Sequence, residues 1–185
     1  MKLPDFDAVL ETERCFLKIP EESDAETMWN LISENTTQYL IWEKWENYLT
    51  SLKNIISSRK DALEWVSWAS AVYDKNTRKI IGRCGIVRAD PATKSFEIWY
   101  WITESYYGKW LIPECVLRIV AYMFEVWDFE KWIIRCDANN MNSQKVALKC
   151  WFQHEWTLRK YELMKWKLRD TKFFGITRED YFSQS

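Results

Sequence analysis

Cysteine and histidine are the residues whose side chains could bind a metal, form a redox pair or act as nucleophile and base. The chain has five cysteines and one histidine, His154. The cysteines are Cys15, Cys84, Cys115, Cys136 and Cys150. No two of them have the C-x-x-C spacing of zinc sites and redox pairs, and all lie inside apolar runs. We therefore expect no metal site, and we expect the thiols to be buried in a protein of a reducing compartment.

Tryptophan and glycine have unusual counts. The chain has 13 tryptophans and 4 glycines in 185 residues, whereas a typical domain has about 7% glycine. Trp110, Trp151 and Trp166 stand where local chemistry favours glycine: in a loop before a helix, at the end of a helical run and in a turn. Glycine provides positive φ or close backbone approach, and tryptophan provides neither. Any site that depends on glycine at these positions is therefore altered.

Length and charge limit the class of protein. With 185 residues, 48% of them hydrophobic, the chain is long enough for one domain with a sizeable core. The 26 basic and 27 acidic residues give a formal net charge of −1, which argues against binding to nucleic acid or to an anionic membrane surface. The sequence has no apolar run of about 18 residues, and its first residues are too polar for a signal peptide. We expect a cytoplasmic protein.

Hydrophobic periodicity predicts alternating strands and helices. Three of the strands follow one another through short, turn-rich links, as in an antiparallel meander. The predicted elements are a strand at 13–19, helices at about 25–32 and 49–62, strands at 66–73, 79–87 and 95–102, a long helix at 112–126, a strand at 132–136, a helix at 140–149 and a hairpin at 157–164 and 168–176. This order predicts one mixed α/β domain over residues 1–185, with a core at about 10–180 and a largely antiparallel sheet.

The predicted strand at 95–102 has two different faces. Successive side chains of a strand point to opposite sides of the sheet. One face therefore carries Glu97, Trp99 and Trp101. The other face carries Phe96, Ile98, Tyr100 and Ile102.

Four segments in this order resemble a known family. They are the opening LETERCFLKIPEESDAETMWNLI, the strand FEIWYWI, the loop TESYYGKWLIPE and the stretch IIRCDANNMNSQKVALKCWF. Together they resemble the GNAT superfamily of acyl-CoA-dependent N-acetyltransferases, and more narrowly its RimJ/RimL-like branch, which acetylates protein N-terminal amines and related amines. The resemblance covers roughly residues 10–180. It implies the GNAT fold, with a mostly antiparallel twisted sheet of about seven strands and four flanking helices. It also implies acetyl-CoA as co-substrate, and it admits a homodimer.

The resemblance assigns acetyl-CoA contacts to a loop and a strand end. The loop, which falls on the family's pyrophosphate-binding loop, consists of Tyr107, Gly108, Lys109, Trp110, Leu111 and Ile112. Backbone N–H groups at the start of a helix bind phosphate well. The family pattern has Arg or Gln, then Gly, then Gly or Ala at the positions of Tyr107, Trp110 and Ile112. The backbone around Ile102 would pair with the pantetheine arm. The alternatives are an ordinary loop and a core residue.

Asn140 and Ser143 match an Asn-x-x-Ser pattern at the start of a helix in this family. The resemblance implies that Asn140 contacts CoA. It also implies that Ser143 hydrogen-bonds or protonates the departing thiolate. The alternative is that both residues cap the helix, a role which both types favour.

Acetylation of an amine needs a group that takes up a proton. The resemblance implies that Glu97 lies near the acceptor site, and a carboxylate buried there would have a raised pKa. The alternative is a structural carboxylate that pairs with an arginine or with the backbone. His154, in the link to the final hairpin, is the other candidate base. Direct transfer to the amine needs no cysteine nucleophile.

Two tryptophans lie in an aromatic segment between the first two predicted helices. In the GNAT architecture, Trp42 and Trp45 would line the acceptor side. An aromatic wall suits a peptide N-terminus or an aliphatic amine. The alternative is that both indoles hold the two helices together.

Five tryptophans fall on characteristic glycines of the RimJ/RimL-like branch: Trp99, Trp110, Trp151, Trp156 and Trp166. Overpacking costs about 1–3 kcal/mol per site, against a typical stability of about 5–15 kcal/mol. Three explanations stay open. The source may be an organism that reads UGA as glycine, so that tryptophan has been written in error, with Trp65 as a further case. The chain is otherwise a natural relative that no longer binds CoA and serves as a binding module, or it is engineered.

The sequence therefore predicts transfer of an acetyl group from acetyl-CoA to a primary amine, in particular a protein N-terminal α-amine. A second prediction keeps the fold and changes the acceptor to a polyamine or an antibiotic amine. A third, of a different class, is a non-catalytic GNAT-like binding module. The residues assigned to catalysis are Glu97 and Ser143.

Overall fold

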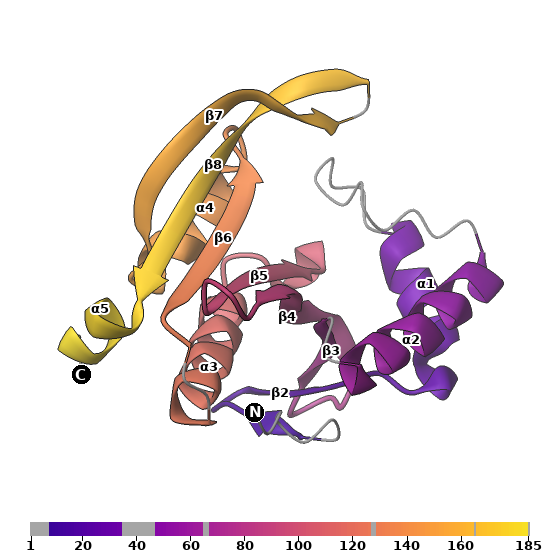
Figure 1. The fold of residues 1–185 in the computed structure, drawn as a ribbon. Coiled ribbons are helices and arrows are strands. Elements are labelled where there is room, and N and C mark those ends of the chain that lie inside the picture. The colour runs from indigo at the N-terminus through magenta and orange to yellow at the C-terminus, as the bar shows by residue number, and fades with distance from the viewer. Residues whose placement is uncertain (1–7, 35–46, 65–66, 127–128, 165, 185) are drawn as a thin grey trace.

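Eight strands form one sheet in the part of the chain that the structure describes, with helices on both faces (Figure 1). The computed structural model describes residues 8–34, 47–64, 67–126, 129–164 and 166–184. The strands are β1 (Leu10–Glu11), β2 (Cys15–Lys18), β3 (Trp68–Asp74), β4 (Ile80–Asp90), β5 (Ser95–Ile102), β6 (Lys131–Asp137), β7 (Gln153–Met164) and β8 (Lys167–Thr177). The helices are α1 (Ala25–Glu34), α2 (Tyr48–Leu63), α3 (Leu111–Val126), α4 (Met141–Lys149) and α5 (Arg178–Ser183), with short 3₁₀ turns at Glu22–Asp24 and Glu104–Tyr106.

The strand order is β1-β2-β3-β4-β5-β6-β8-β7. All neighbouring strands are antiparallel except β5 and β6, which are parallel and are joined through α3. The predicted mixed α/β class and largely antiparallel sheet are confirmed. The described residues contain eight strands and five α-helices, compared with about seven and four predicted. The difference includes two very short elements, β1 with two residues and α5 with six.

Two apolar clusters hold the helices to the two faces of the sheet. On one face, α3 and α4 pack on β4, β5 and β6 through residues such as Ile119, Ile98 and Trp132. On the other face, α1 and α2 pack on β3 and β4 through Met28 and Ile55. Sheet and helices are therefore layered, and each face of β5 meets a different set of helices.

Strand β5 confirms the predicted alternation. Phe96 and Ile98 belong to the cluster under α3, and Tyr100 and Ile102 pack against it. Trp101 belongs to the cluster under α1 and α2, with Trp99 packed against it. Glu97, by the same period, lies on the α1 and α2 face.

The centre of the larger cluster is aromatic. Trp132 is fully buried, and its ring stacks on Phe96 with 4.8 Å between centroids. Phe124 meets the same indole edge-on at 6.3 Å, and Phe129 stacks on the other ring at 3.7 Å from Phe96. These contacts fix the start of β6 against α3, and so fix where β6 leaves its neighbour.

Strands β7 and β8 form a long hairpin at the end of the sheet, seen in orange and yellow in Figure 1. Strand β7 has no second strand partner among the described residues, and most of its side chains are exposed. Its pairing with β8 is interrupted twice, between His154 and Trp156 and between Leu158 and Glu162.

All five cysteines are unpaired and buried, which confirms the prediction of core thiols. In the described ranges, no group of three or more His, Cys, Asp or Glu side chains could hold a metal ion. Of the helices that the structure describes, none is both long enough and apolar enough for a membrane crossing.

Candidate functional site

The two parallel strands at the centre of the sheet separate halfway along their length (Figure 1). Ser95–Ile98 of β5 pair with Lys131–Ile134 of β6. Beyond this point, the rest of β5 pairs only with β4 and the rest of β6 only with β8, among the described residues. The edge of β5 from Trp99 to Ile102 that turns away from β4 is therefore free of strand pairing. An extended ligand with amide groups could bond to this edge.

Ile102 ends β5 at this free edge. Its backbone pairs with Gly82 on the β4 side. Its side chain packs against the cluster under α3. The side chain is therefore a packing residue, while the backbone is placed as the predicted pantetheine contact requires.

The loop from Tyr107 to Trp110 leads from the end of β5 into α3. It follows the 3₁₀ turn at Glu104–Tyr106, and Leu111 is the first residue of α3. Gly108 and Trp110 both have left-handed backbone, with φ of 74° and 61°. Backbone turns of this kind, placed at the start of a helix, make concave arrays of N–H groups that attract anions. The loop therefore has the position and the backbone form of a phosphate-binding loop.

Arg14, which follows β1, fastens this loop to the first turn of α3. Its Nη1 donates to the carbonyl oxygen of Lys109 at 3.0 Å, and its Nη2 lies 2.8 Å from Glu114 Oε2. Burial alone would raise the pKa of Glu114, but hydrogen bonds from Thr12 and Arg14 and the charge of Arg14 lower it below its ordinary 4.5. The ammonium of Lys109 lies over the ring of Tyr106 at 4.4 Å. Two cations thus border the loop.

Asn140 and Ser143 lie at the start of α4, beside β6. Asn140 is the N-cap of α4, and its Oδ1 accepts a hydrogen bond from the backbone N–H of Ser143 at 3.1 Å. Asn140 thus fulfils the capping alternative. Because this hydrogen bond uses the backbone of Ser143, the hydroxyl of Ser143 remains available for other contacts.

The hydroxyl of Ser143 meets β5. Ser143 Oγ lies 3.0 Å from the hydroxyl of Tyr100, which also donates to the carbonyl oxygen of Ser143 at 3.2 Å. Burial raises the pKa of Tyr100 well above its usual value, so the phenol stays protonated. Burial also raises the pKa of Cys136 to about 11, although a hydrogen bond with Ser143 works against this shift. Ser143 therefore bridges the two separating strands, from Tyr100 on β5 to Cys136 on β6.

Glu97 lies on the opposite face of β5, one residue before the pairing with β6 ends. Its Oε1 accepts a hydrogen bond from Arg135 Nε at 2.6 Å, and 14% of its side chain is exposed. Burial lowers the pKa of Arg135, but the hydrogen bond and charge of Glu97 outweigh burial and raise it overall. The ion pair is what the structural alternative for Glu97 predicts. It also fixes this carboxylate where the strands part.

The remaining candidates lie elsewhere. His154 is exposed on β7, with Nε2 2.9 Å from Thr157 Oγ1. Strand β8 separates β7 from β6, so the structure does not bring His154 to the parting strands. Trp42 and Trp45 lie outside the described residues.

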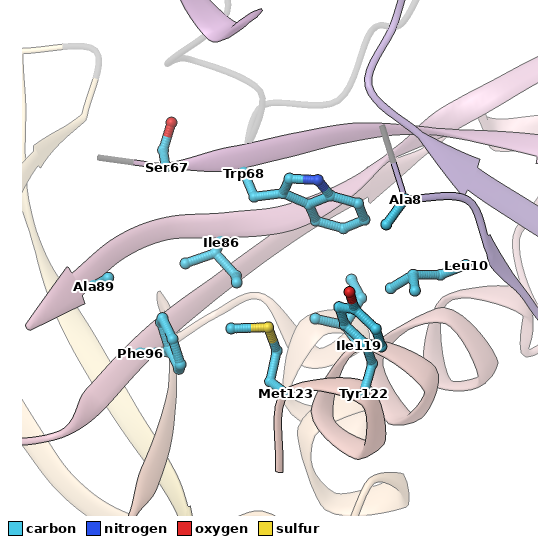
Figure 2. Close-up of a pocket in the computed structure, with 10 residues that line it drawn as sticks. All are labelled: Ala8, Leu10, Ser67, Trp68, Ile86, Ala89, Phe96, Ile119, Tyr122 and Met123. Atoms are coloured by element: carbon cyan, nitrogen blue, oxygen red, sulfur yellow. The ribbon is translucent and has the colours of Figure 1, made fainter. Parts of the chain in front are cut away.

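A small apolar cavity lies under the sheet, between β1, β3, β4, β5 and α3 (Figure 2). Trp68, Ile86, Phe96 and Met123 are among the residues that line it. Its volume is about 30 Å³, whereas binding sites for small molecules typically have about 300–1,000 Å³. This cavity is therefore a packing defect of the core, and the parted strands remain the candidate site.

Parted parallel strands beside a helix that begins in a phosphate-type loop are also found in the family whose sequence pattern this chain matches. The sequence model described as acetyltransferase (GNAT) domain matches residues 14–153. The chain belongs to the GNAT acetyltransferase family. The resemblance inferred from the motifs is thus confirmed, and the chain is an acyltransferase by family.

Relatives and solved structures agree with this assignment. The chain is 26% identical over 174 residues to the uncharacterized N-acetyltransferase p20 of Bacillus licheniformis, covering 93% of this chain and 97% of that protein. It is 22% identical over 163 residues to the ribosomal-protein-serine acetyltransferase of Escherichia coli K12, covering 83% and 87%. Its fold matches that of RimL, a ribosomal L7/L12 α-N-protein acetyltransferase solved with coenzyme A, with a TM-score of 0.86 at 17% identity over 92% and 98% of the two chains.

Sequence reasoning missed three residues of this GNAT site. Tyr100 was counted only as a core residue of β5, although a tyrosine on an apolar face needs a partner for its hydroxyl. Arg135 lies on the same face of β6 as Glu97 does on β5, and the period of two could have paired them. Arg14 gave no signal, because it contacts Glu114 from 100 positions away.

Proposed function

We propose that this GNAT protein transfers an acetyl group from acetyl-CoA to a primary amine, in particular to a protein N-terminal α-amine. The observation that carries the proposal is the parting of β5 and β6 directly beside the loop that starts α3. The parted strands offer free backbone edges to an extended ligand, and the loop offers N–H groups to its phosphates. A long molecule with a diphosphate at one end and amides along its arm fits both features.

Acetyl-CoA would lie along the free edge of β5. The backbone at Ile102 would bond to the pantetheine amides. The pyrophosphate would meet the N–H groups of the loop from Tyr107 through Gly108, Lys109, Trp110 and Leu111 to Ile112, with the charges of Lys109 and Arg14 nearby. Asn140 would act on the coenzyme by holding the first turn of α4 in place.

Transfer would proceed by direct attack. The amine nitrogen forms a bond to the thioester carbonyl carbon, and the C–S bond then breaks, leaving the coenzyme thiolate and an acetylated amine. Ser143 Oγ donates a proton to the sulfur and recovers one from solvent. A water held by Glu97 takes the proton that the amine loses. Tyr100 stays protonated and orients the hydroxyl of Ser143.

A protein N-terminus is the acceptor class that the relatives favour. The E. coli relative is named for a ribosomal-protein serine, and RimL for the α-amine of ribosomal L7/L12. Trp42 and Trp45 are proposed to line the acceptor side. Polyamines and antibiotic amines are the competing acceptors, since they present the same primary amine.

One observation favours a second function, that of a binding module without catalysis. Trp110 puts a half-exposed indole into the loop where phosphates would meet the backbone. A chain that cannot accept the coenzyme would keep the GNAT fold and lose the chemistry. Partner binding through exposed aromatic residues would then be its role.

Titration calorimetry with acetyl-CoA and an acetyl-transfer assay distinguish these functions. Micromolar binding, with transfer to peptides that begin with serine or alanine, supports the proposal. Transfer only to spermidine or to an aminoglycoside would replace the protein acceptor by a small amine. Absence of binding by the chain and by its Trp110→Gly form would refute the enzyme.

Location and assembly also stay proposals. We propose that the protein is cytoplasmic and that it forms a homodimer. Light scattering on the purified chain tests the dimer. Fractionation of the source cells tests the location.

A further inference from the structure

Three tryptophans of this chain have left-handed backbone. In the described residues, φ is positive at six residues other than glycine, and three of the six are Trp110 at 61°, Trp151 at 65° and Trp166 at 65°. The left-handed region costs a residue with a Cβ about 1–2 kcal/mol. For a bulky residue it is a genuine outlier. The three sites lie in unrelated elements, so no single distortion explains them.

Trp151 occupies the glycine position of a helix-ending motif. Helix α4 has Cys150 as its C-cap, and Trp151 follows it. The N–H of Trp151 bonds to the carbonyl of Leu148 at 3.1 Å, and the N–H of Phe152 bonds to the carbonyl of Ala147 at 3.0 Å. These two bonds define the Schellman motif, in which the residue after the C-cap is left-handed and is usually glycine. The backbone here is complete, and only the side chain is out of place.

Trp166 occupies the glycine position of a tight hairpin. Met164 pairs with Lys167, so the loop between β7 and β8 has two residues and Trp166 is the second. Two-residue loops with left-handed backbone at this position strongly favour glycine. The side chain of Trp166 is 94% exposed. Packing therefore does not hold the indole in this conformation.

Trp110 occupies the corresponding position in the loop before α3. It is the second left-handed residue of this loop, two places after Gly108 at φ 74°. Its side chain is 50% exposed. Here glycine would allow a ligand to approach the bare backbone.

Other tryptophans of the chain behave as tryptophans normally do. Trp68, Trp101 and Trp132 lie in strands, are at most 9% exposed and are absent from the residues with positive φ. Trp29 packs against the cluster under α1 and α2. Backbone and burial thus separate two groups: indoles that fill the core, and indoles that occupy glycine backbone and project from the surface.

We propose that residues 110, 151 and 166 are glycine in the protein that the source organism makes, because its ribosomes read UGA as glycine. A translation that assigns tryptophan to UGA as well as to UGG gives the printed chain. One decoding rule then explains three backbone anomalies in a loop, a helix end and a hairpin. The inference does not rest on the proposed function. Its consequence for that function is a phosphate loop with two glycines in place of one.

The codons test the proposal directly. We expect UGA at positions 110, 151 and 166, and UGG at 68, 101 and 132. UGG at the three left-handed positions overturns the proposal. Trp99 and Trp156 fall on glycines of the family but have ordinary φ, and Trp99 packs beneath Arg83 with 5.1 Å from Cζ to the ring centroid. The family resemblance predicts UGA at both of these positions.

Peptide mass spectrometry of the protein purified from the source gives the second test. We expect peptides that contain residues 110, 151 and 166 with the mass of glycine at each position, and peptides with tryptophan at 132. Tryptophan masses at the three left-handed positions overturn the proposal. This readout does not require activity, so it stays distinct from any failure of acetyl transfer.

Thermal unfolding of recombinant variants gives the third test. Each of Trp110→Gly, Trp151→Gly and Trp166→Gly is expected to raise Tm by about 2–4 °C, because glycine removes the left-handed strain. The matched control is Trp132→Gly, which empties the core and is expected to lower Tm strongly. If all four substitutions lower Tm, the three indoles stabilise the fold and the proposal fails.

Discussion

The hydrogen bond between Tyr100 and Ser143 allows a quantitative test of the proposed chemistry. Ser143 Oγ is 3.0 Å from the Tyr100 hydroxyl, and the two residues come from strands and helices on opposite sides of the parted site. If Ser143 protonates the departing thiolate, Tyr100 contributes by fixing the direction of its hydroxyl. Tyr100→Phe removes one neutral hydrogen bond and leaves the ring in place.

The size of each effect follows from the role of the group. A general acid contributes about 10²–10⁴-fold, so Ser143→Ala is expected to lower kcat at least about a hundredfold. One neutral hydrogen bond is worth about 1 kcal/mol, which corresponds to about a fivefold loss of kcat for Tyr100→Phe. Because Tyr100 acts only through Ser143, adding Tyr100→Phe to Ser143→Ala should cost nothing further in kcat.

Steady-state kinetics with saturating peptide give kcat, and the KM for acetyl-CoA should stay the same in all three variants. The measurements are made in the printed chain and in its Trp110→Gly form, so that coenzyme binding does not limit the comparison. Unfolding curves serve as the control for global damage. Additive losses in kcat for Ser143→Ala and Tyr100→Phe would refute the positioning role of Tyr100.

Three further predictions concern the core, the loop and the carboxylate. Trp132→Ala should lower the free energy of unfolding by about 3–5 kcal/mol, because a fully buried indole stacked on the core is lost; a loss below about 1 kcal/mol in denaturant titration would contradict the packing. The folded-state pKa of Glu114 is lowered, so its contribution to stability is present above the ordinary value and is lost as the pH falls through the folded pKa. Glu114→Gln should therefore cost about 0.5–1 kcal/mol at pH 7, discounted because Arg14 is partly exposed, and the difference from the parent should shrink in acid; a constant difference at all pH values would refute it. Glu97→Gln should lower kcat about a hundredfold with little change in the KM for acetyl-CoA, whereas a loss confined to Tm and shared with Arg135→Gln would show that Glu97 is structural.

The sequence predicted the elements well because their periodicity is local. The alternation of β5 between Phe96 and Ile98 on one face and Trp99 and Trp101 on the other is written directly in eight residues. The apolar stripe of α3 likewise needs only its own sixteen residues. The separation of β5 from β6 was expected only through the family, since nothing in either strand alone states where pairing ends.

The contacts of the site could not be predicted from local patterns. Tyr100 meets Ser143 across 43 positions, and Glu97 meets Arg135 across 38. Each depends on how two strands are placed by α3 between them. Burial of the Tyr100 hydroxyl is a property of the assembled domain. Sequence reasoning therefore named Glu97 and Ser143 but missed the partner that holds each of them.

The irregular outer strand β7 has a consequence for self-association. An exposed edge strand offers backbone groups to a strand of another molecule, which is a common route to aggregation. In β7, the two interruptions of pairing leave only Trp156–Leu158 and Glu162–Met164 in regular register beyond the first residues. Bulges bend and twist a strand, so another chain can align with only a few residues at a time. The same irregularity that shapes the hairpin thus protects the open end of the sheet from fibril-like stacking.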